Sequence, residues 1–299
     1  MSKQPTQKWL PGFIALGIVW GSSFLFIKWG LESFTSVGVA FMRGAIGGLT
    51  LLAYSLATKT KLPNKLKDWM HLAVLAMLLN AIPGFLFAFG EQHVSSVMAG
   101  LLNATTPLMA GIVIALVFRE QRVNKDQTIG IVLGFLGIAS LTGAFNGFSQ
   151  SSWVGVVALL AATLCYGISF PYSKRYISTM TYTSTALATA QVCSSAILLA
   201  PFALIFGIRT GELTTHAIWG MLALGAAGTG VAYIWNFRNV RLAGSAVAST
   251  VTYITPLVAT ILGIAFLNEP FGIHQVLGGL LVLFSAALIQ KRVRIFSKG

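Results

Sequence analysis

The sequence predicts an all-α integral membrane protein, built from ten transmembrane helices in two inverted five-helix repeats with both termini cytoplasmic. Three observations carry this prediction. Apolar residues make up 56% of the 299 positions and charged residues only 9%, whereas soluble domains are about one quarter charged. The basic residues gather in alternate connections between long apolar runs, and the second half of the sequence repeats the first. The bilayer is therefore the solvent in which this fold must be explained.

Ten apolar runs reach the length of roughly 20 residues that a helix needs to cross a ~30 Å hydrocarbon core. They cover about 10–30, 36–57, 69–90, 94–118, 127–146, 153–173, 182–207, 216–237, 244–267 and 273–290. Backbone groups in lipid must pair within their own segment, so the runs are predicted to be helices; strands of a membrane barrel are about half as long and alternate in polarity. The first run is predicted to be a retained helix, because it is too long for a signal peptide.

The positions of lysine and arginine predict the orientation, because cytoplasmic loops retain an excess of positive charge. With the N-terminus inside, seventeen of the 20 basic residues fall in inner segments. They are Lys3, Lys8, Lys59, Lys61, Lys65, Lys67, Arg119, Arg122, Lys125, Lys174, Arg175, Arg238, Arg241, Lys291, Arg292, Arg294 and Lys298. The net charge of +13 is thus explained by topology, and nucleic acid is not an expected partner because the charges do not gather on one face.

The two halves of the sequence resemble each other at a nearly constant offset. A shift of 146 residues lays 15–28 over 161–174 with five of fourteen positions identical. A shift of 148 lays 85–89 over 233–237, with aromatic residues at alternate positions of both. A shift of 149 matches eight of twenty-five positions across 96–120, including the tripeptide ThrProLeu and the glutamate at the end. The slow drift of the offset is what small loop insertions produce.

Each repeat contains five spans, so the second copy enters the membrane from the opposite side. We therefore predict two units of inverted topology, 1–146 and 147–299. Inverted repeats create a binding site near the bilayer midplane that rocking exposes to either side in turn. Transport by alternating access is accordingly the predicted function, and structural duplication without transport is the alternative.

Paired motifs recur in order along nearly the whole chain: TrpGlySerSerPhe at 20–24, TyrGlyIleSerPhe at 166–170, and small-residue ThrProLeu helices that end in Glu120 and Glu269. This pattern resembles the EamA-like branch of the drug/metabolite transporter superfamily. The resemblance implies a ten-helix carrier of the bacterial inner membrane, in which the fifth and tenth helices pack at the back and the others enclose a central cavity. Many such carriers export amino acids or other small metabolites.

The expected partners are therefore a small-molecule substrate, with an amino acid or similar amphipathic compound as the best guess, and membrane lipid. The expected assembly is a monomer or a weak homo-oligomer. A multidrug efflux pump or lipid flippase of the same fold is the alternative, since its cavity would be similarly aromatic and apolar. Energy coupling stays open, because only Glu32 and Glu91, near the outer rim, approach the deep inward carboxylate of a proton-driven pump.

Catalysis, cofactors and metals are not expected. The aspartates Asp68 and Asp126 lie at cytoplasmic loops, and the four histidines are scattered near span ends without an H-E-x-x-H motif. The cysteines Cys165 and Cys193 lie inside apolar spans and have no ligand spacing. An intramembrane enzyme is therefore disfavoured.

Eight side chains within the spans are candidates for substrate binding, because polar and aromatic groups at depth need a partner. They are Trp20, Asn80, Phe87, Asn103, Tyr166, Gln191, Tyr233 and Tyr253. Trp20 and Tyr166 occupy corresponding places near the middle of their spans, where either a wet cavity or buried helix packing satisfies their polar atoms. Hydrogen bonds between helices are the alternative role for the amides.

Six residues are candidates for gating or structural roles: Arg43, Pro83, Pro107, Pro256, Glu120 and Glu269. Arg43 lies roughly 10 Å below the outer surface, where it binds a substrate carboxylate or pairs with Glu32 or Glu91; a structural or gating role is favoured. Pro107 and Pro256 are repeat mates and predicted hinges. The two glutamates follow the ends of spans, where capping or anchoring of a loop is expected.

Two further features have structural interpretations. Lys28 lies near the outer end of the first span, where snorkelling and a contact with the helix dipole account for it. Gly130, Gly134 and Gly137 permit close contact between helices.

Overall fold

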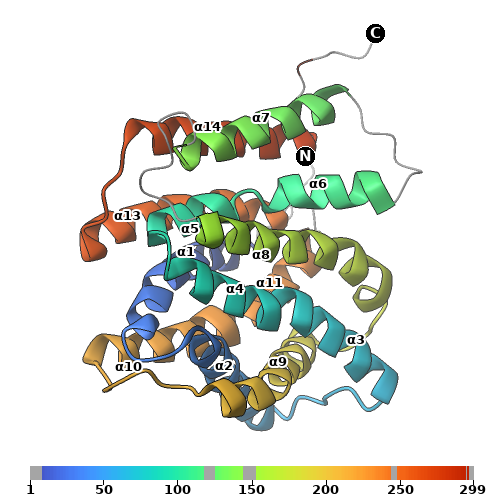
Figure 1. Cartoon of the computed structure of the whole chain (residues 1–299). Helices are drawn as coiled ribbons and strands as arrows, with labels where there is room; N and C mark the ends of the chain where they lie inside the picture. The colour runs from blue at the N-terminus through green and yellow to red at the C-terminus, as the bar shows by residue number, and fades with distance from the viewer. Residues whose placement is uncertain (1–8, 118–124, 144–152, 244–247, 294, 296–299) are drawn as a thin grey trace.

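The computed structural model describes residues 9–117, 125–143, 153–243, 248–293 and 295, and these residues are almost entirely helical (Figure 1). The first half contains α1 (Leu10–Leu31), α2 (Ser36–Ala57), α3 (Leu66–Ala76), the π-helix η1 (Met77–Ala81), α4 (Ile82–Glu91), α5 (Ser96–Asn103), α6 (Thr106–Val117) and α7 (Lys125–Leu141). The second half contains α8 (Trp153–Tyr172), the π-helix η3 (Ser173–Ile177), α9 (Ser184–Phe206), α10 (Thr215–Leu222), the π-helix η4 (Ala223–Val231), α11 (Ala232–Ala243), the 3₁₀-helix η5 (Ser249–Tyr253), α13 (Thr255–Leu267) and α14 (Ile273–Ile289).

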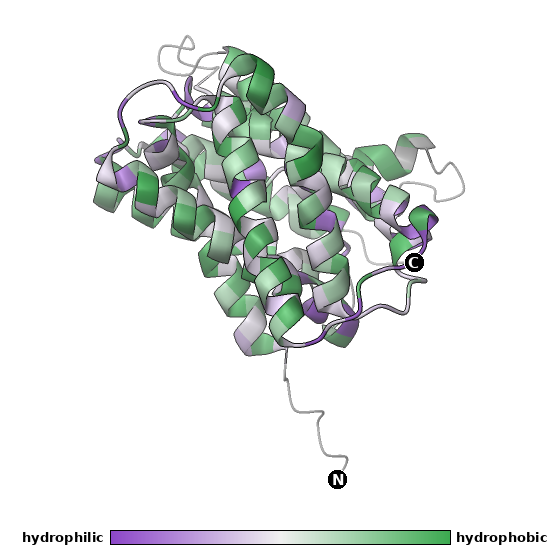
Figure 2. Ribbon diagram, turned by 90° about the horizontal axis from the view of Figure 1, so that it is seen from below, coloured by the Kyte–Doolittle hydropathy of each residue, from purple (hydrophilic) through white to green (hydrophobic). Residues whose placement is uncertain are grey.

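Within these ranges, 8 continuous helical stretches are long and apolar enough to cross a membrane, and α14 is a shorter apolar helix. The remaining predicted span corresponds to α7, which has 17 residues. The all-α membrane fold is confirmed, whereas the count of ten spans and the cytoplasmic termini stay predictions. Large apolar side chains point outward as in a membrane protein: Leu204 is 82% exposed and Leu56 is 79% exposed. Figure 2 shows that hydrophilic residues are few and are most frequent in the connections.

Hydroxyl side chains fix where several helices begin. Thr35 precedes α2 and its hydroxyl accepts the backbone N–H of Gly38, with an N–O distance of 2.8 Å. Thr183 precedes α9 and accepts from Ala186 in the same way at 3.1 Å. These caps satisfy one of the N–H groups that a helix start leaves unpaired, and they stand at corresponding places in the two halves. The repeat seen in the sequence therefore extends to how its helices start.

The two halves interleave, and the main contacts between them have mates under exchange of the halves. α1 packs against α13, and its counterpart α8 packs against α6. α2 packs against η4, and its counterpart α9 packs against α3. Two pairs join counterparts directly, α2 with α9 and α7 with α14 (Figure 1). This pattern is what a two-fold relation between the halves produces.

The α7–α14 pair forms a layer of its own at the edge of the molecule (Figure 1). Glycines bring the two backbones together: a Cβ built on Gly137 would lie 3.0 Å from the carbonyl oxygen of Gly278, and one built on Gly278 would lie 2.8 Å from that of Gly137. The hydroxyl of Ser285 donates to the carbonyl of Gly130 at 2.6 Å. We call this contact the glycine seam; it places the fifth and tenth runs back to back, as the resemblance implied.

Candidate functional site

A cluster of polar and aromatic side chains lies between the two halves, away from the glycine seam. We call it the central cluster. It consists of Trp20 (α1), Arg43 (α2), Asn80 (η1), Phe87 (α4), Tyr166 (α8), Gln191 (α9), Thr229 (η4) and Tyr233 (α11). Six of these are among the eight predicted substrate contacts, Arg43 was predicted as a gating residue, and Thr229 was not predicted.

The aromatic members pack on one another in two pairs. The rings of Trp20 and Tyr233 meet edge to face with centroids 5.9 Å apart, and those of Phe87 and Tyr166 stack at 5.9 Å. The indole N–H of Trp20 donates to the carbonyl of Gly228 at 3.2 Å, and the hydroxyl of Tyr233 donates to the carbonyl of Leu79 at 3.0 Å. Both acceptors lie in the π-helical segments, where widened turns release carbonyls from the regular ladder.

The buried amides Asn80 and Gln191 form a pair that is only half satisfied. Their exposed fractions are 4% and 0%, and the Nε2 atom of Gln191 donates to the Oδ1 atom of Asn80 at 2.6 Å. The Nδ2 atom of Asn80 and the Oε1 atom of Gln191 have no hydrogen-bond partner within the described ranges. Leaving such a group unpaired costs about 1–3 kcal/mol. The pair therefore presents one free donor and one free acceptor side by side.

Arg43 supplies the positive charge of the central cluster. Its Nε atom donates to the hydroxyl of Thr229 at 3.2 Å, and its side-chain Cδ lies 3.6 Å from a Cβ built on Gly84. The two terminal nitrogens of the guanidinium have no hydrogen bond to any part of the chain that the structure describes. Glu32, one predicted partner, instead accepts from Thr214 at 2.7 Å. Arg43 therefore keeps a free planar fork of the kind that binds carboxylates.

Two predicted substrate contacts lie outside the central cluster. The Nδ2 atom of Asn103 donates to the hydroxyl of Thr255 at 3.5 Å, which links α5 to α13. The hydroxyl of Tyr253 donates to the Oε1 atom of Gln290 at 3.0 Å, which links η5 to the end of α14. Both side chains act in the structure as links between helices.

The predicted hinge prolines follow breaks in the helices. Pro107 is the second residue of α6, after the gap that separates α6 from α5, and Pro256 is the second residue of α13, after η5. Pro83 is likewise the second residue of α4, which follows η1. The duplicated proline thus marks a duplicated interruption; the hinge role of Pro107 and Pro256 and the gating or structural role of Pro83 stay predictions.

Of the two glutamates that were predicted to cap or anchor, only Glu269 is among the described residues. Glu120 lies outside the described residues. The carboxylate of Glu269 accepts from the backbone N–H of Ser96 at 2.7 Å, from that of Val97 at 2.8 Å and from the Ser96 hydroxyl at 3.0 Å. These donors belong to the first turn of α5, so Glu269 caps a helix of the other half.

Lys28 and Glu91, at the predicted outer ends of their spans, are more buried in the protein than the sequence suggests. The ammonium of Lys28 donates to the backbone carbonyls of Glu91 and Val94, so it is bound within the protein rather than directed only to the interface as snorkelling requires. Glu91 is 0% exposed, although its place in the sequence suggests the rim. No local pattern reveals this burial, because it depends on how α1 and α8 cover the end of α4.

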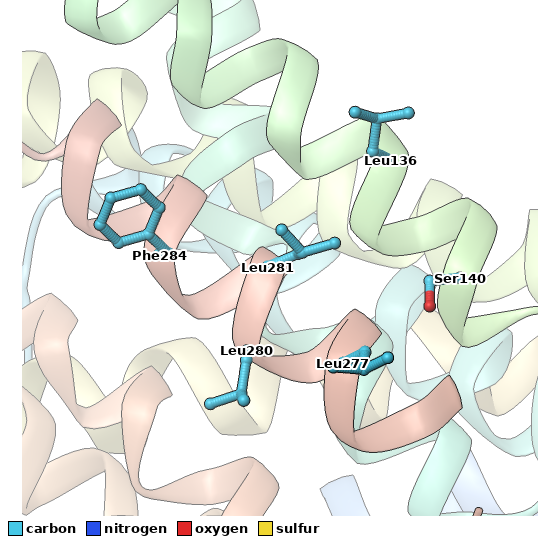
Figure 3. A pocket seen from close by; sticks show the side chains of 6 residues that line it. All are labelled: Leu136, Ser140, Leu277, Leu280, Leu281 and Phe284. Carbon is cyan, nitrogen blue, oxygen red and sulfur yellow. The ribbon is translucent and has the colours of Figure 1, made fainter. Parts of the chain in front are cut away.

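A groove lies elsewhere, on the outer face of the glycine seam (Figure 3). Its volume is about 560 Å³ and its lining is apolar apart from one serine, whose hydroxyl donates to the carbonyl of His274 at 3.0 Å. The lining side chains are Leu136, Ser140, Leu277, Leu280, Leu281 and Phe284. An outward apolar groove on a membrane protein suits lipid chains and offers a polar substrate nothing to bind. No group of three His, Cys, Asp or Glu side chains in the described ranges could hold a metal ion.

Comparisons with known proteins agree with this architecture. The sequence profile of the EamA-like transporter family matches residues 7–143 and again residues 153–290. The chain is 26% identical over 300 residues to the uncharacterized transporter YdfC of Bacillus subtilis, covering 99% of this chain and 96% of that protein. It is 28% identical over 284 residues to the uncharacterized inner membrane transporter YedA of Escherichia coli, covering 92% and 88%.

A third relative has a more specific name. The probable terminal-alkyne amino-acid exporter of Streptantibioticus cattleyicolor is 24% identical over 281 residues, covering 92% of this chain and 91% of that protein. A solved crystal structure matches with a TM-score of 0.65 and 18% identity, covering 95% of this chain and 98% of that one, which supports the fold alone. The double match of the profile, together with the helical membrane architecture, shows that this chain belongs to the EamA-like transporter family and is a multi-pass membrane transporter.

Proposed function

We propose that this chain exports an amino acid or a similar small amphipathic metabolite across the bacterial inner membrane by alternating access. In this proposal ten spans with cytoplasmic termini form two inverted units, 1–146 and 147–299, and the central cluster between them binds the substrate. Opening of the interface on one side and then on the other exposes the cluster to each compartment in turn. The chain performs no catalysis in this scheme.

The observation that carries the proposal is the set of free polar groups in the central cluster. Arg43 offers two unpaired guanidinium nitrogens, Asn80 one unpaired N–H group and Gln191 one unpaired carbonyl oxygen. A substrate carboxylate accepts from Arg43 and Asn80, and a further N–H or O–H group of the same compound donates to Gln191. The rings of Trp20 and Tyr166 supply surface for its apolar part.

Two further observations support the choice of mechanism and substrate. The main contacts between the halves occur in mated pairs, so a rocking motion that opens one end has an equivalent that opens the other. A relative that aligns with 92% of the chain is named as a probable amino-acid exporter.

A multidrug pump or lipid flippase is the second candidate. The apolar groove of Figure 3 favours it, because six mostly aliphatic side chains form a surface for acyl chains. Arg43 disfavours it, because a positive charge in the central cluster repels lipophilic cations.

Binding to the purified transporter tests the proposal. Each of the twenty common amino acids is added in turn, and then a set of lipophilic cations, while the midpoint of thermal unfolding is measured. A ligand at 100 times its dissociation constant stabilises the folded form by about 2.7 kcal/mol, which is readily detected. We expect stabilisation by a subset of amino acids, loss of it in Arg43→Gln, and retention in the matched variant Tyr253→Phe outside the cluster. Stabilisation by the cations alone would favour the second candidate.

A further inference from the structure

Glu91 is the last residue of α4, and its side chain is fully buried. Neither carboxylate oxygen has a hydrogen-bond partner among the residues that the structure describes, and no basic side chain of those residues lies within ion-pair distance. Burial of an ionised carboxylate without partners is among the costliest arrangements in a protein. An apolar side chain of similar size would be cheaper here, so the carboxyl group calls for a functional reason.

Titratable groups approach this carboxyl from several elements. Lys28 of α1, Arg43 of α2 and Glu269 after α13 act on it electrostatically. Tyr166 of α8 stacks on Phe87 and His93, just beyond α4, contacts Phe89, whereas η1 and α5, which also pack on α4, carry no titratable group. The ammonium of Lys28 is already bound to two backbone carbonyls. Arg43 acts electrostatically on Glu91 and also belongs to the central cluster. Arg43 therefore connects the two places.

Glu269 provides a direct contrast at the same end of the molecule. Its carboxylate accepts three hydrogen bonds from the first turn of α5, so it is held in place for structural reasons. Glu91 has the same chemistry and none of these donors. A structural role thus explains one carboxylate and leaves the other unexplained.

We propose that Glu91 is the proton-carrying residue of the transporter, and that a proton and the ammonium group of the substrate alternate at its carboxylate. The inference rests on the proposed function, since it assigns the energy source of the same export. Its physical basis is that the structure buries Glu91 without partners, so the charge must be neutralised for this arrangement to form. Either a proton or a substrate cation does this, while Arg43 holds the substrate carboxylate.

The cycle then runs as antiport. With the outer side open and the substrate released, the Glu91 carboxylate accepts a proton from external water and an O–H bond forms. The neutral carboxyl becomes buried as the outer end closes. When the inner side opens, the O–H bond breaks, the proton passes to internal water and the electron pair stays on the carboxylate oxygen. The ammonium of the next substrate takes the place of the proton, which permits closure and outward movement.

Proton release on binding is the primary test. The purified full chain is mixed, in weak buffer with a pH-sensitive dye, with the twenty common amino acids in a pool as the probe. We expect about one proton to be released per bound amino acid in the unaltered chain and none in Glu91→Gln. Binding of the pool without proton release would overturn the inference and leave the proposed function intact.

Reconstituted vesicles extend the test to transport. Vesicles that are acidic inside should accumulate the labelled pool, with a tenfold proton gradient sustaining up to about a tenfold substrate gradient for one proton per substrate. Glu91→Gln should lose this accumulation and Glu91→Asp should recover part of it. The matched variant Glu269→Gln should lower thermal stability while its folded fraction still accumulates substrate. Accumulation by Glu91→Gln equal to that of the unaltered chain would contradict the proposal.

An infrared measurement keeps the two proposals separable if no amino acid binds. A protonated carboxyl without hydrogen bonds has a distinct C=O stretching band, and we expect such a band in the unaltered chain but not in Glu91→Gln. Its presence, together with its loss on raising the pH, supports a proton-carrying Glu91 even where the amino-acid substrate is wrong. Absence of the band at all pH values would overturn the inference.

Discussion

The glycine seam and the central cluster are both interfaces between the two halves, yet they treat polar groups in opposite ways. In the seam, the hydroxyls of Ser285 and Ser140 donate to the carbonyls of Gly130 and His274 at 2.6 and 3.0 Å. In the central cluster, Asn80 and Gln191 each keep one buried polar atom without a partner in the described ranges. These polar groups of the seam are satisfied within the protein, whereas those of the central cluster need a ligand or water to be satisfied.

The difference indicates which interface is fixed and which one exchanges partners. A satisfied, close-packed contact has a single favourable arrangement, whereas buried groups without partners gain when a ligand arrives or when the interface opens to water. We infer that the seam holds the halves together throughout the cycle while the central cluster changes.

The largest effect is expected where the seam is overfilled. Gly278→Leu would place a Cβ 2.7 Å from the backbone nitrogen of Leu141 and 2.8 Å from the carbonyl oxygen of Gly137, and neither backbone can move aside cheaply. We expect a loss of about 3 kcal/mol or more and little folded protein, measured by size-exclusion chromatography of a fluorescent fusion. Gly211→Ala is the control, because a Cβ there meets nothing within 4 Å. A folded, monodisperse Gly278→Leu would show that the seam is not closely fixed.

The next largest effect is expected on transport and not on folding. Arg43→Gln should abolish transport while expression and unfolding temperature stay near normal, because its single hydrogen bond to Thr229 contributes about 1 kcal/mol. The measurement is efflux of a bound amino acid from cells. Arg209→Gln, an exposed arginine in a connection, serves as the control. Near-normal efflux in Arg43→Gln would remove Arg43 from the mechanism.

A smaller effect should separate the two interfaces by the sign of the stability change. Replacing Asn80 and Gln191 together by leucine removes two unpaired atoms along with one hydrogen bond, so we expect unchanged or increased thermal stability and roughly tenfold weaker binding. Ser285→Ala in the seam removes a satisfied bond and should cost about 1 kcal/mol without affecting binding. Calorimetry and ligand titration measure both. Equal destabilisation of the two variants would erase the proposed contrast.

The smallest effect is expected for a partly buried hydrogen bond that lies outside both interfaces. The hydroxyl of Tyr182 donates to the Oδ2 atom of Asp68 at 2.7 Å, and this bond raises the pKa of Tyr182 above its usual value. The stabilisation is present below the unfolded pKa of about 10 and is lost as the pH rises through the folded pKa. Tyr182→Phe should slightly flatten the alkaline decline in unfolding temperature. An identical pH profile would mean that the bond contributes nothing measurable.

Much of the fold follows from the sequence, because its causes are local or periodic. Apolar length predicts the spans, and the offset between the halves predicts their pairing, which the contacts between α7 and α14 reflect. The π-helical segments were not predicted, since a widened turn has no characteristic composition. Pro83 is the nearest residue that signals an interruption, and it lies just after η1.

The candidate site was predictable in part. Residue type and depth identified six members of the central cluster, because polar and aromatic groups must turn away from lipid. The same rule does not separate these from Asn103 or Tyr253, which bond to partners on neighbouring helices. Thr229 was missed because a threonine among glycines gives no signal until the fold brings it to Arg43. Burial of Glu91 depends on distant helices and has no local signature.

The π-helical segments η1 and η4 have a consequence for rotation within each span. One residue turns an α-helix by about 100°, and a π-helical insertion holds an extra residue that offsets the helix before it from the helix after it. Because η1 and η4 stand at corresponding places in the sequence, both halves carry this offset in the same span of the repeat. The directions in which Phe87, Glu91 and Tyr233 point around their helix axes therefore differ from those that an uninterrupted α-helix would give them. Each of these spans therefore consists of two α-helices with different rotational settings, and Asn80 and Thr229 of the central cluster lie in the π-helical segments that join them.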